Sequence, residues 1–299
     1  MNQSKEAFFV KYAKIFVILG VLAGSTSGIF GALIEAPALA IGFWRLLIAT
    51  PFFIVPVVRN QKEELKRISK KDFLLTILAG FFLFAHFFCW FNAVKITNVP
   101  SAVVLASLHP LLVLCVSVLI WRRKITYKAV LAIVAALIGS TIIAGLDYKM
   151  LSQGVFLGDI LAFLAGSFMG AYFLVGDAAR KRVSGRPYVM LVFIFCWIFF
   201  ILGIIFTNTP VFGYDVKDYI LLVAYALVCQ IGAHAVFNLC IGHVDALYVS
   251  TWSSGESVFA IILSIIFLKQ IPTSWQIIGS IMVVGALLYY NRETAKNNV

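Results

Sequence analysis

The sequence predicts an all-α membrane protein with ten transmembrane helices, arranged as two inverted five-helix repeats around a central cavity. Three observations predict this fold class: the composition, a series of apolar runs of membrane-spanning length, and motifs shared by the two halves. Of the 299 residues, 62% are apolar and 12% are charged, whereas a soluble domain has roughly 45–50% apolar and about 25% charged residues. The mean hydropathy of +0.99 excludes a soluble fold, because such a chain could not bury its apolar surface in water.

Ten apolar runs follow one another along the chain. A bilayer core of about 30 Å requires roughly 20 apolar residues per helix. The runs occupy residues 14–34, 38–58, 73–94, 99–121, 127–146, 155–178, 188–208, 218–241, 245–268 and 274–291. Because further runs follow the first at once, we expect the first to be a span and not a cleaved signal peptide. The runs take up most of the chain and leave no room for a soluble catalytic domain.

Lys and Arg residues are distributed unevenly between the loops that join these runs. With the N-terminus placed in the cytoplasm, the cytoplasmic segments carry 19 of the 24 Lys and Arg residues and the opposite side carries four. Positive residues concentrate in cytoplasmic loops, so both termini are predicted in the cytoplasm, with the protein in the plasma or inner membrane. The net charge of +11 lies in short loop clusters and not on one basic face, so no nucleic-acid partner is expected.

Motifs shared by the two halves predict an internal duplication. The motif Leu-Ala-Gly-Ser at residues 22–25 recurs at 164–167, followed in each case by a glycine three positions later. A second match runs from Phe91 and from Phe237, at an offset of 146 residues. The predicted repeats are residues 1–146 and 147–299. Because five is odd, the second copy would enter the membrane from the opposite face, as is common in secondary transporters.

Glu256 is the clearest candidate for a functional residue, because it lies near the middle of the ninth run. An ionisable group in hydrocarbon costs at least about 2.5–3.5 kcal/mol, so it usually faces a cavity and marks function. Trp252 and Tyr248 precede it at spacings of four, which places all three on one helical face. An aromatic wall ending in a carboxylate is suited to an amine or a quaternary ammonium group. The alternative is that Glu256 is protonated and has a structural or proton-coupling role.

The eighth run carries Gln230, His234 and Asn238 at spacings of four. Such a regular polar stripe is not expected to face lipid. Its members would either hydrogen-bond to neighbouring helices or line a transport pathway. In the third run, His86 and Trp90 share a face in the same way, and they are further candidates for contact with a substrate.

His109 lies near the middle of the fourth run, immediately before Pro110. A proline frees a backbone carbonyl in a helix, so these two residues are candidates for a kink that opens and closes. The histidines at similar depth could also relay protons, because the reference pKa of histidine is close to neutrality. No two of His86, His109 and His234 share a helix at ligand spacing, so no metal site is predicted.

Small residues recur in the first and sixth runs, where they are expected to let helix backbones approach closely. The adjoining Ser25 and Ser167 are candidates for reaching the cavity. Arg45, in the second run, has three possible roles: binding a substrate carboxylate, snorkelling outward, or pairing with Glu35.

A secondary transporter explains the duplication, the polar residues at mid-depth and the absence of a soluble domain. The chain contains no P-loop, which excludes an ATP-driven pump within it, and no cofactor is expected. A channel or an intramembrane enzyme that uses His86, His109 and Glu256 is the alternative, but no channel filter loop and no GxSxG or HExxH motif accompanies these residues. The expected substrate is a small organic cation or zwitterion, such as an amino acid or an amine. Movement would be proton-coupled or by exchange, in a monomer or a homodimer.

The chain resembles the drug/metabolite transporter superfamily and, within it, the EamA-type ten-helix group. The resemblance is carried by the paired Gly-Ser motifs, by Phe-Trp-Arg-Leu-Leu-Ile-Ala at residues 43–49, by His109-Pro110, and by Gly-Glu-Ser-Val-Phe-Ala at residues 255–260. Family members often have Leu-Glu-Pro where this chain has Gly-Glu-Ser, so the glutamate matches and the proline does not. The resemblance implies a basket of helices around a central cavity, with the fifth and tenth spans at the periphery. It also implies movement of small organic solutes by alternating access.

Overall fold

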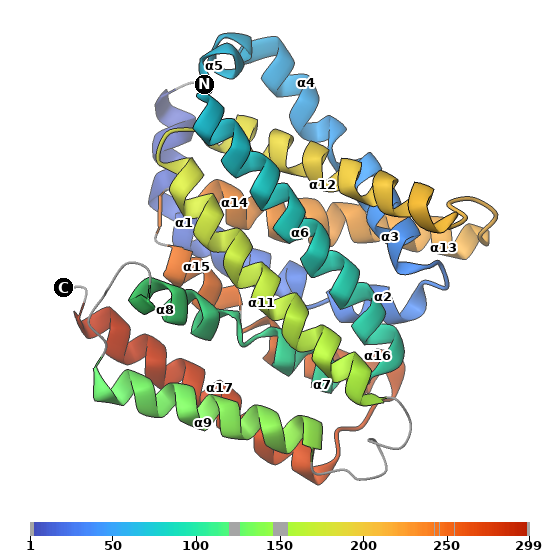
Figure 1. The fold of residues 1–299 in the computed structure, drawn as a ribbon, viewed down its shortest axis with the longest axis vertical. Helices are drawn as coiled ribbons and strands as arrows, with labels where there is room; N and C mark the ends of the chain where they lie inside the picture. Colours follow the sequence, from blue (N-terminus) through green and yellow to red (C-terminus); the bar gives the residue numbers. More distant parts are fainter. Residues whose placement is uncertain are drawn as a thin grey trace.

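The computed structural model describes residues 3–119, 126–145, 155–241, 243–244, 246–253 and 255–297. Apart from one isolated bridge between Ile241 and Val244, these residues form helices and their connections (Figure 1). The first half contains α1 (Gln3–Gly24), α2 (Ser27–Leu33), α3 (Ala38–Ala49), α4 (Pro51–Asn60), α5 (Lys62–Arg67), α6 (Lys70–Ile96), α7 (Val99–Ala106), α8 (His109–Leu119) and α9 (Tyr127–Gly145). The second half contains α11 (Val155–Arg180), α12 (Gly185–Thr207), α13 (Val216–Tyr225), η1 (Ala226–Ala235), α14 (Val236–Cys240), α15 (Ala246–Ser253), α16 (Glu256–Leu268) and α17 (Ser274–Asn297).

Six helical stretches of the described chain are long and apolar enough to cross a membrane. They are Tyr12–Leu33, Ala38–Asn60, Lys70–Ile96, Val155–Arg180, Gly185–Thr207 and Val216–Cys240. The other four predicted runs correspond to the pair α7 and α8, to α9, to the pair α15 and α16, and to α17. All ten apolar runs therefore coincide with helices, and the count of ten spans stays a prediction.

Local sequence explains where several of these helices begin and end. Ser69 accepts a hydrogen bond from the Asp72 backbone N–H at 3.1 Å and caps the start of α6. Asn98 caps α7 in the same way, accepting from the Ser101 N–H at 2.9 Å. Such side chains satisfy donors that the first helical turn leaves free. The C-terminal ends of α12 and α16 are at Asn208 and Lys269. Their φ angles of 51° and 54° are left-handed and do not allow a right-handed helix to continue.

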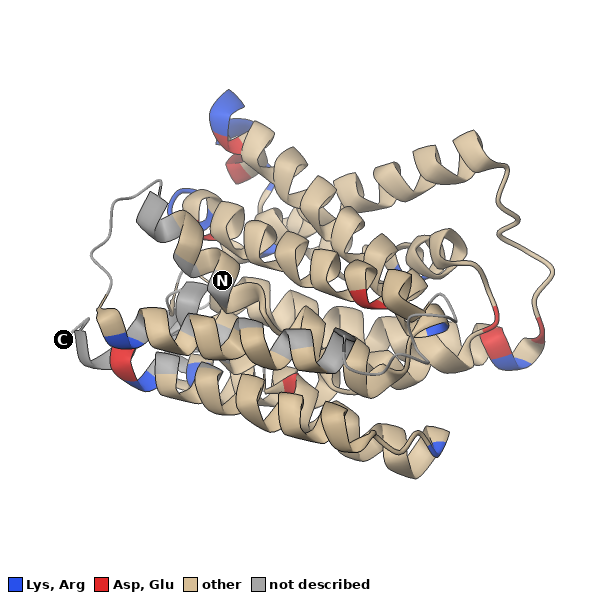
Figure 2. Ribbon diagram, turned by 60° about the horizontal axis from the view of Figure 1, so that its bottom comes forward, with Lys and Arg blue, Asp and Glu red and all other residues tan. Residues whose placement is uncertain are grey.

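The surface has the distribution expected for a protein in lipid. Large apolar side chains such as Leu74, Phe206 and Ile281 are well exposed, and charged residues gather mainly towards the ends of the helical bundle (Figure 2). Buried positions include many small and polar residues, which favour close contact between helices in membranes. The apolar helices and this surface identify an integral membrane protein.

The helices pack as pairs that cross the bundle. The long helices α6 and α11 lie side by side, α12 packs against α3 and α6, and α1 packs against η1. The pair α9 and α17 lies together along one edge of the bundle (Figure 1). A particularly close approach joins α11 to the end of α7, where a methyl group on Gly166 would collide with the Ala106 carbonyl oxygen.

Polar contacts tie the connections together at the end of the bundle where α5 lies. Arg182, in the connection between α11 and α12, forms an ion pair with Asp72 at 2.7 Å. Glu64 of α5 accepts hydrogen bonds from the backbone N–H and the hydroxyl of Ser184, at 2.9 and 2.7 Å. The connection before α12 is therefore joined to the segment that precedes α6.

A second set of contacts closes the end of the bundle where α2 meets α3. Lys95 donates to the backbone carbonyls of Ile34 and Ala36, at 3.1 and 2.5 Å. Asp218 accepts from the Glu35 backbone N–H at 3.1 Å. The short connection between α2 and α3 is thus held by α6 on one side and by α13 on the other.

Candidate functional site

In the second span, Thr50 between α3 and α4 keeps helical backbone angles (φ −61°, ψ −40°), but three other predicted spans are interrupted. The first breaks between α1 and α2, the fourth between α7 and α8, and the ninth between α15 and α16. Serine and threonine hydroxyls bond to the backbone at the breaks: Ser25 donates to the Leu22 carbonyl at 2.7 Å and Ser107 to the Val103 carbonyl at 2.6 Å. Such bonds compete with regular helical hydrogen bonding. Pro110, near the start of α8, also lacks the N–H that would continue the helix from α7.

A fourth irregularity is the π-helical segment η1, between α13 and α14. Its hydrogen bonds join residues five positions apart, and π-helical turns occur frequently at functional sites. η1 carries Gln230 and His234, two of the polar residues that the sequence analysis singles out.

All four irregular segments meet at one cavity of about 60 Å³. The first break contributes Gly24, Ser25 and Ser27, and η1 contributes His234. The break between α7 and α8 contributes Ser107 and His109, and the break between α15 and α16 contributes Ser253 and Glu256. Further lining residues are His86 and Trp90 of α6, Met169 of α11, and the apolar Gly28, Val103, Ala106 and Ala260. This volume is enough for a few water molecules, since each needs roughly 10–15 Å³.

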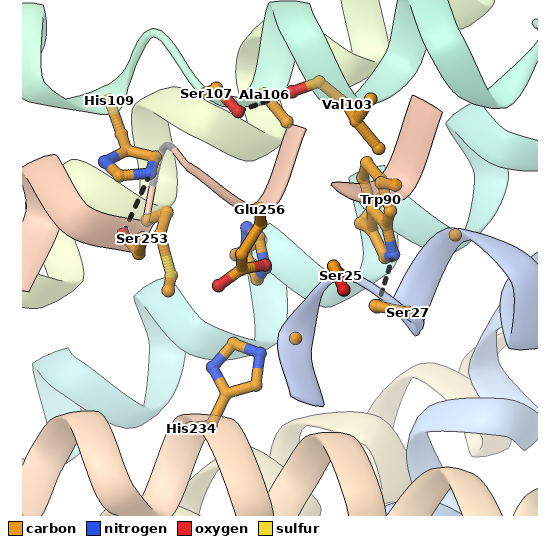
Figure 3. Close-up of a pocket in the computed structure, with 15 residues that line it drawn as sticks. Ser25, Ser27, Trp90, Val103, Ala106, Ser107, His109, His234, Ser253 and Glu256 are labelled. Carbon is orange, nitrogen blue, oxygen red and sulfur yellow. Dashed lines mark hydrogen bonds between the residues drawn. The ribbon is translucent and has the colours of Figure 1, made fainter. Parts of the chain in front are cut away.

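Glu256 lies in the middle of this cavity (Figure 3). It is the first residue of α16, where the helix dipole favours a negative charge. A methyl group on Gly24 would lie 2.5 Å from the carboxyl carbon of Glu256 and 2.6 and 2.7 Å from its two oxygens. The carboxylate therefore packs directly on the last turn of α1, at a position where only glycine leaves room for it.

His109 connects two of the helix breaks. Its Nδ1 lies 2.8 Å from the Ser250 hydroxyl oxygen and its Nε2 lies 3.3 Å from that of Ser253. Both hydroxyls belong to α15, whereas His109 begins α8. Figure 3 shows the ring beside Ser253 at the edge of the cavity. Because both ring nitrogens have partners, the orientation of the ring is fixed.

His86 and His234 both line the cavity, and their rings are neighbours. Their ring centroids are 5.8 Å apart. The Nδ1 of His86 lies 2.8 Å from the Ala165 carbonyl oxygen on α11, whereas the Nδ1 of His234 has no hydrogen-bond partner among the described residues. Figure 3 shows His234 reaching towards Glu256 from η1.

Trp90 belongs to a short chain of hydrogen bonds that leads away from the cavity. Its indole N–H donates to the Ser27 hydroxyl at 3.0 Å, and that hydroxyl lies 2.7 Å from the Tyr225 hydroxyl. The chain links α6, α2 and the end of α13.

The structure does not bring every predicted residue to the cavity. Trp252 is 43% exposed and does not line it, because the break before Glu256 ends the regular spacing that would place both residues on one face. The side chain of Tyr248 lies outside the described residues. Ser167 bonds to the Phe163 carbonyl at 3.0 Å and also lies away from the cavity.

Gln230 and Asn238 are fully buried but lie outside the cavity lining. The π-helical turn widens the helix, so residues four apart no longer share a face with His234. Asn238 donates to the His234 carbonyl at 2.7 Å and to the Tyr172 hydroxyl. Pro110 is buried beside His109 and also does not line the cavity.

The sequence analysis misses several lining residues: Ser27, Ser107, Ser253 and Met169. Ser107 stands two positions before His109-Pro110, and the residue directly before a proline, here His109, is biased away from the helical conformation. That bias is a signal that could identify the break. No comparable local signal marks Met169, which reaches the cavity through the packing of α11.

Arg45 neither snorkels outward nor pairs with Glu35. The arginine is fully buried, and Glu35 is exposed. The guanidinium carbon lies 4.4 Å from the ring centroid of Phe87 and 4.3 Å from that of Tyr225. All three guanidinium nitrogens lack a hydrogen-bond partner among the described residues.

Known proteins are similar to this chain in sequence or in fold. YxxF of Bacillus subtilis (strain 168), an uncharacterized transporter, is 25% identical over 302 aligned positions that cover 100% of this chain and 94% of the relative. The uncharacterized transporter sll1164 of Synechocystis sp. (strain ATCC 27184 / PCC 6803 / Kazusa) is 22% identical over 261 positions, covering 79% of this chain and 71% of its own. A crystal structure of another protein aligns with a TM-score of 0.67 and 16% identity over 97% of this chain and 99% of its own, which shows a common fold.

The sequence profile of the EamA-like transporter family matches the chain twice, over residues 11–145 and over residues 156–292. The two matches together cover most of the sequence, and they are separated by ten residues. The family and the transporter relatives point to transport and not to enzymatic catalysis. The chain is therefore a membrane transporter that belongs to the EamA-like transporter family.

Proposed function

We propose that the protein is a secondary transporter that carries a small organic cation or zwitterion, such as an amine or an amino acid, by alternating access through the cavity around Glu256. The observation that carries this proposal is the meeting of three helix breaks and a π-helical segment at one carboxylate. Interrupted helices near mid-membrane form the binding sites of many secondary transporters, because their free backbone groups and helix ends interact with solutes and ions.

A duplication into residues 1–146 and 147–299 is supported by the helix contacts, and five spans per copy would make it an inverted repeat. α6 packs against α11, and η1 packs against α1 in the equivalent position of the other half. In the same way, α7 and α8 contact α11, and α15 and α16 contact α1. The pairs α3 with α12, and α9 with α17, join equivalent spans of the two halves. The breaks after Ala106 and after Ser253 are 147 residues apart, close to the 146-residue offset of the sequence motifs. The double match of the family profile has the same periodicity.

Alternating access requires the cavity to enlarge and to open on each side in turn. The present volume of about 60 Å³ is smaller than the roughly 300–1,000 Å³ of typical organic ligand sites. We infer that the breaks beside Ser107 and Ser253 act as hinges, with His109 joining them. Both termini and the connection around α5 would face the cytoplasm, in keeping with the distribution of Lys and Arg.

Glu256 would either hold the positive group of the solute or carry a coupling proton, because a carboxylate at this depth requires a cation or a proton. Glu256→Gln distinguishes the two roles. If the carboxylate binds the solute cation, the amide should weaken binding by about 1.5–3 kcal/mol. If it carries the proton, the amide should leave binding nearly intact and remove its pH dependence.

The experiment is a thermal-shift screen of amines and amino acids on detergent-purified protein, followed by counterflow of each stabilising compound in liposomes. Glu35→Gln, which neutralises an exposed carboxylate outside the cavity, is the matched control. Unchanged binding, pH profile and counterflow in Glu256→Gln, with a compound that the native protein transports, would refute the role of this residue. If no compound of the screen stabilises the protein and is transported in counterflow, the proposed substrate class is refuted.

The alternative of an intramembrane enzyme has little support from the geometry. The Ser253 hydroxyl lies near His109, but it donates its hydrogen bond to the Ser250 carbonyl at 2.8 Å. A serine nucleophile needs its proton directed at the base, and here it points to the backbone.

A further inference from the structure

A buried cation, which forms no ion pair within the described part of the chain, lies beside the cavity. Arg45 of α3 is fully buried, and no ion pair among the described residues includes it. Glu256, on the other side of the cavity wall, makes no ion pair among these residues either. Charged groups inside a membrane are costly and are usually retained for function, so this guanidinium requires an explanation.

Aromatic rings surround the Arg45 guanidinium at cation–π distance, and none of its nitrogens has a hydrogen-bond acceptor among the described residues. Phe87 and Tyr225 lie with their ring centroids 4.4 and 4.3 Å from the guanidinium carbon, and Phe91 lies 5.8 Å away. The N–H groups of a guanidinium lie in its plane, and a carboxylate binds there through two parallel hydrogen bonds. All three nitrogens have no acceptor among the described residues. Cation–π contacts stabilise the charge, while the hydrogen-bond donors stay unused.

Arg45 is one aromatic ring away from the cavity. The Phe87 ring that covers it also contacts His234, at 4.8 Å between centroids, and His234 lines the cavity with His86. The Tyr225 ring is connected to the cavity through Ser27, whose hydroxyl also accepts from Trp90. A change at Ser27 or His234 on solute binding would therefore move the rings that separate the two charges.

Gln230 is a further buried polar group on the same segment of chain. It follows Tyr225 on η1 by five residues and precedes His234 by four. Its amide nitrogen and oxygen both lack a partner among the described residues, as does the Nδ1 of His234. Three buried groups that can donate hydrogen bonds to an anion, namely the Arg45 guanidinium, the Gln230 amide nitrogen and the Nδ1 of His234 when it is protonated, thus lack partners among the described residues. Native proteins leave few buried polar groups unpaired.

We propose that Arg45 is a carboxylate-binding subsite next to the Glu256 cavity, so that the transported solute is a zwitterion held by its ammonium group at Glu256 and by its carboxylate at Arg45. This inference rests on the proposed function and specifies the substrate class of the same site. Opposite charges at the two ends of the site match such a solute and discriminate against a simple amine, which would leave the guanidinium unpaired.

The test uses sets of three related probes: an α-amino acid, its carboxamide and the amine that lacks the carboxylate. Binding of each probe is measured by thermal shift on the full-length protein in detergent, and uptake is measured by counterflow in liposomes. The native protein should bind the best amino acid at least about tenfold more tightly than its carboxamide, the loss expected for one charge-assisted pair. Arg45→Gln should abolish this preference, and Arg45→Lys should retain part of it.

Two controls separate this role from a structural one. A merely structural Arg45 would lower the stability of Arg45→Gln but leave the ratio of acid to carboxamide affinity unchanged, and that result would overturn the proposal. Lys95→Gln removes a cation that holds the connection between α2 and α3, and it should keep the native ratio. If Arg45→Gln does not fold, the ratio in Arg45→Lys decides: a ratio equal to the native one overturns the proposal.

Further outcomes separate this inference from the proposed function. If the native protein binds amines and carboxamides as tightly as amino acids, and Glu256→Gln weakens all of them, the transporter of organic cations stands and the Arg45 subsite is overturned. If chloride alone stabilises the native protein but not Arg45→Gln, and the acid to carboxamide ratio is the same in both, Arg45 binds an inorganic anion and the proposal fails. If no probe binds to or is transported by the native protein, both proposals fail.

Discussion

Gly24→Ala tests the packing of Glu256 on α1 directly. The added methyl group would lie 2.5 Å from the carboxyl carbon of Glu256, whereas favourable contacts between carbon atoms are at about 3.5–4.0 Å. The carboxylate must therefore move by about 1 Å, or α1 and α16 must separate. Overpacking of this kind costs about 1–3 kcal/mol, and the better helix propensity of alanine offsets about 0.5–1 kcal/mol of that cost.

We expect a net loss of roughly 1–2 kcal/mol in stability, measured as the free energy of unfolding in detergent. We also expect solute binding to weaken about tenfold, which corresponds to about 1.4 kcal/mol. Glu256→Asp shortens the side chain by one methylene group and withdraws the carboxylate from Gly24. In the double variant, part of the stability should return, with a coupling energy of about 1 kcal/mol.

Gly285→Ala is the matched control, because a methyl group there would have no neighbour within 4 Å. In the middle of α17 this substitution should be neutral or stabilising by about 0.5–1 kcal/mol. Equal effects of the Gly24 and Gly285 substitutions would refute the reasoning. Additive effects of Gly24→Ala and Glu256→Asp would refute it as well, since the two sites would then not be in contact.

Three further predictions concern the cavity lining, an ion pair and the membrane topology. Trp90→Phe should weaken solute binding several-fold, because the hydrogen bond to Ser27 is lost. Trp252→Phe, at an exposed position, should leave the dissociation constant unchanged. A larger loss of binding in Trp252→Phe than in Trp90→Phe would contradict the assigned cavity lining. Arg182→Ala should lower the stability in detergent slightly at low salt and less at high salt, because the arginine of this pair with Asp72 is 48% exposed and salt screens it. A loss independent of salt would argue against an ion pair. A cysteine at position 66 should react with a membrane-impermeant thiol reagent only after cells are opened, and labelling of intact cells would reverse the predicted topology.

Hydropathy alone predicts where the helices lie, because a membrane helix must be apolar over its whole length. It does not predict the helix breaks, since each break lies inside one apolar run of the sequence. At the breaks, serine hydroxyls bond to the backbone and other helices make contacts. For this reason Trp252 does not line the cavity with Glu256, whereas Glu256, His86 and His109, which the sequence analysis selects for their depth, line the same cavity.

The environment of Arg45 also lies beyond sequence reasoning. Three rings that cover it come from α6 and from the end of α13, far away in the sequence. A regular spacing within one helix cannot reveal such a contact. The π-helical turn of η1 has the same effect on the stripe of Gln230, His234 and Asn238, because one extra residue per turn redirects each of them separately.

The pair α9 and α17 contributes none of the described residues of the cavity wall, although it packs closely along one edge of the bundle. With 19 residues, α9 is about 28 Å long, close to the thickness of the hydrocarbon region. Adaptation to bilayers of different thickness, or attachment of a reporter group, can therefore take place in this pair without altering solute recognition.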